Sequence, residues 1–265
     1  MNIQIIYLIL AFCLTAILGK VVIPILRKLK VGQSEREDGP RSHLRKQGTP
    51  TMGGIMMIIS IIICTTIACF ASRNFQEIKK ILIISIASLG FGVIGFIDDF
   101  KKVVLHNTEG LNPSLKMLGL LVISVLYTMV LLKYTQISTE LILPFTAYRV
   151  ILPVKFFVPF TIIVMLSATN AVNLTDGVDG LAGSVSSIMI TAISIIAIKS
   201  GNIEVSIFGA IVVGTCFGFL IYNFHKAKVM MGDTGSLLLR RSYFLYGNLF
   251  ANTSIFIDYC NYTCS

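Results

Sequence analysis

Long apolar segments constrain the fold of this sequence more than any other feature. Crossing a bilayer as a helix takes about 20 apolar residues. Seven segments approach or reach that length, at residues 3–26, 51–72, 80–97, 115–133, 156–172, 183–199 and 203–223. Only 13% of the residues are charged, whereas a water-soluble domain carries roughly 25%. The sequence therefore predicts an all-α, polytopic integral membrane protein with about seven transmembrane helices.

The basic residues between these segments are shared unevenly between the two sides of the membrane. If the helices alternate in direction, the links after the first, third and seventh segments lie on one side and hold most of the 22 Lys and Arg residues. Cytoplasmic loops are enriched in Lys and Arg. We therefore expect the N-terminus outside and these three links in the cytoplasm. The same bias accounts for the net charge of +9, so no nucleic acid partner is expected.

Acidic residues gather at the expected cytoplasmic ends of the helices. The stretch GFIDDFKK places Asp98 and Asp99 at the end of the third apolar segment. A helix C-terminus favours cations, so two carboxylates there need a compensating positive charge. A divalent cation would supply it. The alternative is a solvated helix end with Lys101 and Lys102 as local partners.

The stretch NAVNLTDGVDGLAG places amides and carboxylates at intervals of three residues, at Asn170, Asn173, Asp176 and Asp179. This spacing puts them on roughly one face if the segment is helical. The three glycines between them permit a broken helix or a close backbone approach. The alternative is a polar loop that caps the next helix, although a cap needs one such residue and not four.

Two further stretches lie on the same side. MGDTGS places Asp233 in a glycine-rich turn, which alone is a weak pattern. SHLRKQGTPTMGG combines basic and hydroxyl side chains with two glycines that open a helix, an arrangement that binds anions. A juxtamembrane basic segment that meets anionic lipid is the alternative there. Carboxylates and phosphate oxygens are the ligands that Mg²⁺ prefers, so the four stretches together predict metal-assisted phosphoryl transfer.

Taken together, DGPRSHLRKQGTPTMGG, GFIDDFKK, NAVNLTDGVDGLAG and YNFHKAKVMMGDTGS resemble the bacterial phospho-N-acetylmuramoyl-pentapeptide transferases. This family belongs to the polyprenyl-phosphate N-acetylhexosamine-1-phosphate transferase superfamily. The resemblance covers residues 1 to about 239. The first stretch favours the muramoyl-pentapeptide branch over the N-acetylglucosamine-1-phosphate branch.

The resemblance implies a reaction in peptidoglycan synthesis. Undecaprenyl phosphate attacks the β-phosphate of UDP-N-acetylmuramoyl-pentapeptide, UMP leaves, and the product is lipid I. The family uses Mg²⁺, has ten transmembrane helices in the bacterial cell membrane, commonly forms dimers, and has its site in a cytoplasmic cleft. Two alternatives remain open at this point: a sister transferase that uses UDP-N-acetylglucosamine, and a membrane transporter.

The resemblance also implies roles for three acids. Asp98 matches the acid that deprotonates or positions the lipid phosphate, Asp99 matches its partner, and Asp233 matches the main Mg²⁺ ligand. Direct attack and a covalent phospho-aspartyl route both fit these residues.

Eight other positions match residues that bind the substrate: Lys46, Thr51, Asn170, Asn173, Asp176, Asp179, Asn223 and Met230. By resemblance, Asn173, Asp176 and Asp179 line the nucleoside pocket, with Asp179 facing the uracil. Lys46 and Thr51 match further nucleotide-site positions. Asn170 and Asn223 match polar residues near the catalytic centre.

The sequence departs from the family pattern at three places. Met230 stands where family members usually have a Phe that stacks on the uracil, and Lys226 stands where they have Pro. After Leu239 the family continues Gly-Gly-Ala into further helices, whereas this chain reads RRSYFLYGNL. Arg240, Arg241 and Ser242 can be encoded as AGG-AGG-AGC, and a shift of this reading frame by one base would give Gly-Gly-Ala. We therefore expect residues 1–239 to form an incomplete transferase-like membrane domain and residues 240–265 to be an out-of-frame tail, and the alternative is a genuine divergent tail. The activity of a chain truncated in this way is left open by the sequence.

Overall fold

The computed structural model describes residues 2–29, 49–72, 74–103, 105, 110–134, 140–142, 149–173, 178–199 and 201–239. Its elements in chain order are α1 (Ile3–Lys28), α3 (Gly54–Ala71), α4 (Phe75–Val103), α5 (Pro113–Tyr134), β1 (Glu140–Ile142), β2 (Arg149–Ile151), α6 (Val154–Asn173), α7 (Leu181–Lys199) and α8 (Ile203–Asn223). Residues 232–239 are also helical, and we call them the terminal helix. Lys46, Asp176 and the expected tail of residues 240–265 lie outside the described residues.

The predicted all-α membrane architecture is confirmed. Six of the described helices are long and apolar enough to cross a membrane, and the fifth predicted segment, 156–172, forms α6, whose apolar part Val154–Ile163 is shorter. In lipid no water can bond to exposed backbone groups, so an apolar segment satisfies its N–H and C=O groups by forming a helix. The sequence did not lead us to expect the short antiparallel pair of β1 and β2.

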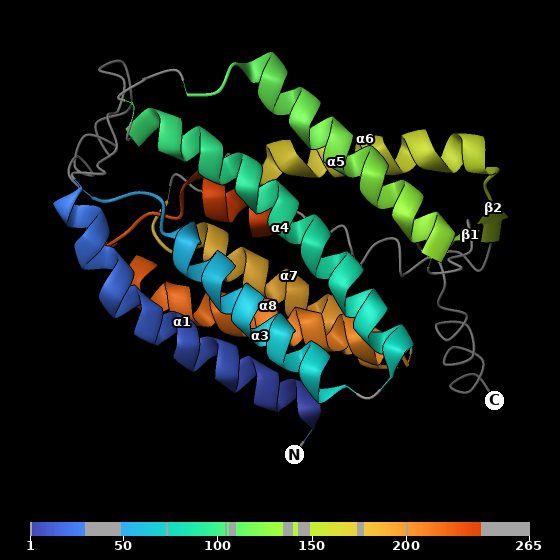
Figure 1. Cartoon of the computed structure of the whole chain (residues 1–265), viewed down its shortest axis with the longest axis horizontal. Coiled ribbons are helices and arrows are strands. Elements are labelled where there is room, and N and C mark those ends of the chain that lie inside the picture. Colours follow the sequence, from blue (N-terminus) through green and yellow to red (C-terminus); the bar gives the residue numbers. More distant parts are fainter. Residues whose placement is uncertain are drawn as a thin grey trace.

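The helices form a bundle around α8, most of which is buried. α1, α7, α3 and α4 all pack against α8, and α5 packs between α4 and α6 (Figure 1). The ends of α1 and α4 and the beginning of α3 lie at the same end of this bundle. The segment that follows α8 also lies at that end, because Met230 and Met231 are hydrogen-bonded to the entrance of α3.

Backbone hydrogen bonds join the entrance of α3 to the segment before the terminal helix. The Met230 N–H donates to the Pro50 carbonyl at 2.8 Å, and the N–H groups of Gly53 and Gly54 donate to the carbonyls of Met230 and Met231, both at 2.9 Å. These bonds fix the start of the terminal helix beside the last turns of α4. Three segments far apart in the chain therefore meet at one end of the bundle.

Candidate active site

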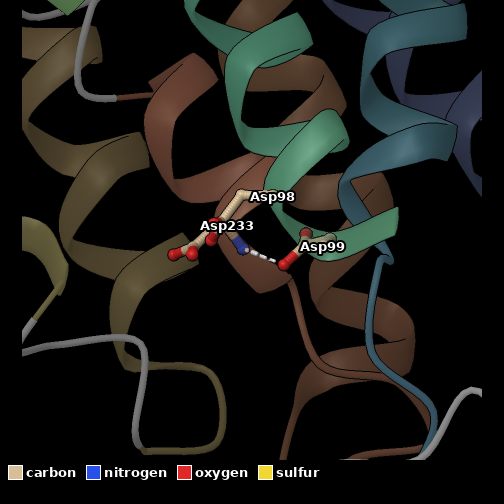
Figure 2. A group of neighbouring side chains, drawn as sticks. All are labelled: Asp98, Asp99 and Asp233. Carbon is tan, nitrogen blue, oxygen red and sulfur yellow. Dashed lines mark hydrogen bonds between the residues drawn. The ribbon is translucent and has the colours of Figure 1, made fainter. Parts of the chain in front are cut away.

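Three carboxylates converge where α4 ends and the terminal helix begins. Asp98 and Asp99 come from α4 and Asp233 from the terminal helix (Figure 2). One carboxylate oxygen of each lies within 4.8 Å of one oxygen of both others. Asp98 and Asp99 are almost fully buried, with 1% and 4% of their surface exposed, and Asp233 is partly buried.

Asp99 binds the beginning of the terminal helix. Its Oδ1 accepts the Asp233 N–H at 3.1 Å, and its Oδ2 accepts the Thr234 N–H at 2.8 Å and the Thr234 hydroxyl at 2.6 Å. The first N–H groups of a helix have no partner within that helix. Asp99, which belongs to α4, therefore caps the terminal helix, and both of its carboxylate oxygens accept hydrogen bonds from that helix.

Gly232 makes this close approach possible. Its φ is +73°, in the left-handed region that glycine adopts at no cost. A Cβ at this position would lie 2.6 Å from Oδ2 of Asp99 and 3.0 Å from Oγ1 of Thr51. The glycine before Asp233 is thus needed both for the backbone conformation and for the space that the Asp99 carboxylate occupies.

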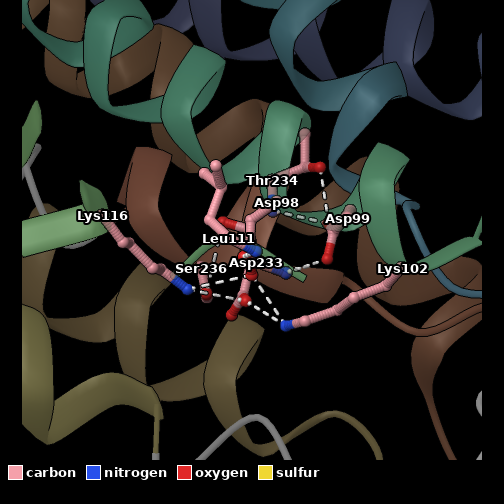
Figure 3. A network of polar contacts seen from close by, with 8 residues as sticks. All are labelled: Asp98, Asp99, Lys102, Leu111, Lys116, Asp233, Thr234 and Ser236. Atoms are coloured by element: carbon pink, nitrogen blue, oxygen red, sulfur yellow. Dashed lines mark hydrogen bonds and ion pairs between the residues drawn. The ribbon is translucent and has the colours of Figure 1, made fainter. Parts of the chain in front are cut away.

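Asp98 and Asp233 face two lysines. Lys102 Nζ lies 2.7 Å from Oδ2 of Asp98 and 2.9 Å from Oδ2 of Asp233, and Lys116 Nζ lies 3.1 Å and 2.8 Å from the same two atoms (Figure 3). The Leu111 N–H also donates to Oδ1 of Asp98 at 2.8 Å. Each ammonium group therefore bridges the two carboxylates.

Charge sets the ionisation of Asp233. Its burial acts to raise the pKa, but the hydrogen bond with Asp98 and the ammonium groups of Lys116 and Lys102 lower it, and the pKa lies well below its usual range. Asp233 is therefore ionised at neutral pH and available as a ligand.

The residues fit a hard divalent cation such as Mg²⁺. The donor atoms are carboxylate oxygens, which this ion prefers. Three carboxyl groups meet here, and two ammonium groups bridge two of them. Because Asp99 caps the terminal helix, Asp98 and Asp233 are the residues that would hold the ion.

A second polar cluster lies where α8 ends. The buried Asn223 accepts the Gly180 N–H on Oδ1 at 3.0 Å, and its Nδ2 donates to the Val229 carbonyl at 2.9 Å. Oδ2 of Asp179 accepts the Ala227 N–H at 3.3 Å. Asn223 and Asp179 thus tie the turn before α7 to the segment that leads to Asp233.

The other residues suggested by the sequence are placed as follows. Asp179 lies in the turn that directly precedes α7, so it is not on one continuous helical face with Asn170 and Asn173. Asn170 and Asn173 lie in the last turns of α6. Thr51 and Met230 are buried, and only 1% of Met230 is exposed.

Sequence reasoning considered Lys102 only as a local partner of the acids on its own helix. It missed the contact of Lys102 with Asp233, the bridging role of Lys116 and the capping contact of Thr234. Lys102 follows Asp98 by four residues on a helix, which is a recognisable pairing signal. Lys116 approaches from a different helix, and no local pattern places it at the acids. The contact between Asp99 and Thr234 joins residues 135 positions apart.

Comparison with known proteins gives a consistent result. The model of glycosyl transferase family 4 matches residues 81–244. A phospho-N-acetylmuramoyl-pentapeptide-transferase of Halalkalibacterium halodurans is 45% identical over 232 residues, covering 88% of this chain and 70% of the relative. Proteins of the same name from Desulfitobacterium hafniense and Bacillus subtilis are 43% and 40% identical, cover 87% and 88% of this chain, and are each covered over 70% of their own length.

Proposed function

Because the chain belongs to glycosyl transferase family 4 and, within it, to the phospho-N-acetylmuramoyl-pentapeptide transferases, we propose that it transfers phospho-N-acetylmuramoyl-pentapeptide from its UDP derivative to undecaprenyl phosphate. A phosphate oxygen of the acceptor bonds to the β-phosphorus of the donor. The bond between that phosphorus and the oxygen bridging to UMP breaks. The products are lipid I and UMP.

The observation that carries this proposal is the ring of Asp98, Asp233 and the two lysines that bridge them. Phosphoryl transfer needs positive charge around the phosphate oxygens and a carboxylate that positions or deprotonates the attacking group. Lys102 and Lys116 supply ammonium groups, and Asp98 supplies the carboxylate. In this assignment Asp98 receives the proton of the acceptor phosphate or orients that phosphate for attack.

Mg²⁺ is the cofactor that we assign to the cluster, held by Asp98 and Asp233. When bound, the ion would neutralise charge on the phosphates as the leaving group departs. The lysines would then turn from the carboxylates to the phosphate oxygens of the substrates. Asp99 is a positioning residue in this scheme, because it fixes the backbone of Asp233 through hydrogen bonds.

We assign the nucleoside to the region beside Asp179, where α8 ends. Asn223 holds this region in place from within the protein, with both ends of its amide group engaged. Met230 is packed against this amide, its sulfur 3.9 Å from Nδ2. Lys46, Thr51, Asn170, Asn173 and Asp176 remain candidates for further substrate contacts.

The active site is assigned to the cytoplasmic face, with the N-terminus outside. The end of the bundle that carries the acids also carries seven of the 14 Lys and Arg residues that the structure describes, namely Arg27, Lys28, Lys101, Lys102, Lys116, Lys226 and Lys228. Five more follow α1 in the sequence, at Lys30, Arg36, Arg41, Arg45 and Lys46. This matches the enrichment of Lys and Arg in cytoplasmic loops. The position of the acids at one end of the bundle also argues against a transporter, since transporters place their functional charges near the middle of the bilayer.

The test is UMP release by the full chain in detergent with Mg²⁺. We expect release from UDP-N-acetylmuramoyl-pentapeptide only when undecaprenyl phosphate is present, and none from UDP-N-acetylglucosamine. Release from the second nucleotide alone would assign the chain to the sister activity. Uptake of substrate into proteoliposomes without UMP release would support transport instead.

A further inference from the structure

An apolar cavity lies between α4 and α5, away from the acids. Its volume is about 330 Å³, within the 300–1,000 Å³ range typical of ligand sites. All but one of its lining side chains lack polar atoms; the lining residues are Ile83, Ile86, Ala87, Gly90, Ile123, Leu126, Tyr127 and Val130. The cavity therefore suits a hydrocarbon chain.

Two lysines lie at the same end of these two helices. Lys79 is four residues before Ile83 on α4, and Lys133 is three residues after Val130 on α5, so each lysine continues the helix face that lines the cavity. Both ammonium groups lie over the ring of Tyr134, each with Nζ 5.6 Å from its centroid. Two positive charges therefore lie near Tyr134, at the end of α4 and α5 toward which the lining faces of the cavity continue.

No ion pair among the side chains that the structure describes involves Lys79 or Lys133. The neighbouring Lys80 does have a partner, Glu204, at 3.0 Å. The acid nearest to Lys79 in the sequence, Glu77, is engaged by the Ser72 hydroxyl at 2.8 Å and by the Asn74 amide at 3.3 Å. Lys79 and Lys133 are therefore available to an external anion.

The depth of this cluster matches a membrane surface. Lys79 precedes Asp98 by 19 residues on one continuous helix, which corresponds to about 28 Å. The hydrocarbon core of a bilayer is about 30 Å thick. The lysines and Tyr134 therefore lie at the interface opposite the acids, where aromatic and basic anchors are common.

We propose that the cavity and these two lysines bind an anionic phospholipid of the leaflet opposite the active site. The phosphate contacts Lys79 and Lys133, and one acyl chain occupies the space between α4 and α5. This site is separate from the transferase reaction and does not depend on it.

The experiment is native mass spectrometry of the full chain, titrated with phosphatidylglycerol or with phosphatidylcholine of identical acyl chains. We expect one phosphatidylglycerol to be retained in preference. Lys79→Gln and Lys133→Gln should each weaken retention about fivefold, and together about 30-fold. Lys155→Gln is the matched control, because Lys155 also lies over an aromatic ring, that of Phe156, but lines no part of this cavity.

A second variant tests the cavity itself. Leu126→Trp fills space between the helices while leaving both lysines in place, so retention of the lipid should fall although the charges are intact. Circular dichroism verifies that each variant is folded. Equal retention of the two lipids by the unaltered chain, or full retention by the double lysine variant, would overturn the proposal. Retention of undecaprenyl phosphate but not phosphatidylglycerol would instead assign the cavity to an isoprenoid.

Discussion

The carboxylate of Asp99 accepts hydrogen bonds from both the backbone N–H and the hydroxyl of Thr234, at 2.8 and 2.6 Å. The contact joins the end of α4 to the beginning of the terminal helix. It places Asp233 next to Asp98, so that two neighbouring acids of α4 have different tasks. Asp99 maintains the geometry, and Asp98 faces the lysines.

Replacing Asp99 should therefore affect stability more than replacing Asp98. Asp99→Ala leaves two buried N–H groups and one hydroxyl without their acceptor, which should cost about 1–3 kcal/mol. In Asp98→Ala, Lys102 and Lys116 keep Asp233 as a partner, so a smaller loss is expected. The measurement is the unfolding temperature in detergent. An equal or larger loss in Asp98→Ala would contradict the capping role.

Gly232 offers a test with an internal control. Gly232 and Gly201 have nearly the same backbone, with φ of +73° and +72°. A Cβ at Gly201 meets nothing within 4 Å, whereas one at Gly232 meets Oδ2 of Asp99 at 2.6 Å. Gly201→Ala should cost about 1–2 kcal/mol for the conformation alone. Gly232→Ala should cost clearly more, and equal unfolding temperatures would refute the steric argument.

Asn223 is expected to act on substrate binding through the turn that contains Asp179. Asn223→Asp keeps the acceptor for the Gly180 N–H but loses the donor to the Val229 carbonyl, and Asn223→Ala loses both. The apparent KM for the nucleotide substrate should therefore rise in Asn223→Asp and rise further in Asn223→Ala. The unfolding temperature should fall in the same order. Identical KM values in both variants would show that this amide does not hold the nucleotide site.

Removing one bridging lysine should have opposite effects on metal binding and on turnover. Lys116→Gln makes the cluster more negative, so it should bind Mn²⁺ more tightly, as measured by electron paramagnetic resonance. The same variant should slow UMP release, because an ammonium group that contacts phosphate is lost. Lys101→Gln is the control, since Lys101 has no ion-pair partner among the described residues. Weaker Mn²⁺ binding in Lys116→Gln would contradict the arrangement.

The sequence was sufficient to predict the membrane helices because their apolar length is a local property. The segment predicted at 203–223 coincides with α8 (Ile203–Asn223). The third segment was predicted to end at residue 97, but α4 continues to Val103. Hydropathy cannot detect this extension, because it is polar. Its acids are stabilised by Lys102 within the extension and by Thr234 and Lys116, which lie elsewhere in the chain.

The site was predictable only in part for the same reason. Sequence motifs identified Asp98, Asp99 and Asp233 as candidates, and the family resemblance implied a role for each of them. The capping task of Asp99 was not expected, because it depends on hydrogen bonds across 135 positions of the chain. Lys116 belongs to α5, and only the packing of α5 against α4 brings it to the acids. Such contacts have no signature within a short stretch of sequence.

The most direct measurement is the rate of acceptor-dependent UMP release by Asp98→Asn beside that of Glu204→Gln. Both residues are buried acids that pair with lysine, but Glu204 pairs with Lys80 in a different part of the bundle. Loss of a group that transfers or positions a proton should slow turnover about 10²–10⁴-fold. We predict this slowing in Asp98→Asn and a nearly unchanged rate in Glu204→Gln. Equal rates in the two variants would show that the acid cluster is not the active site.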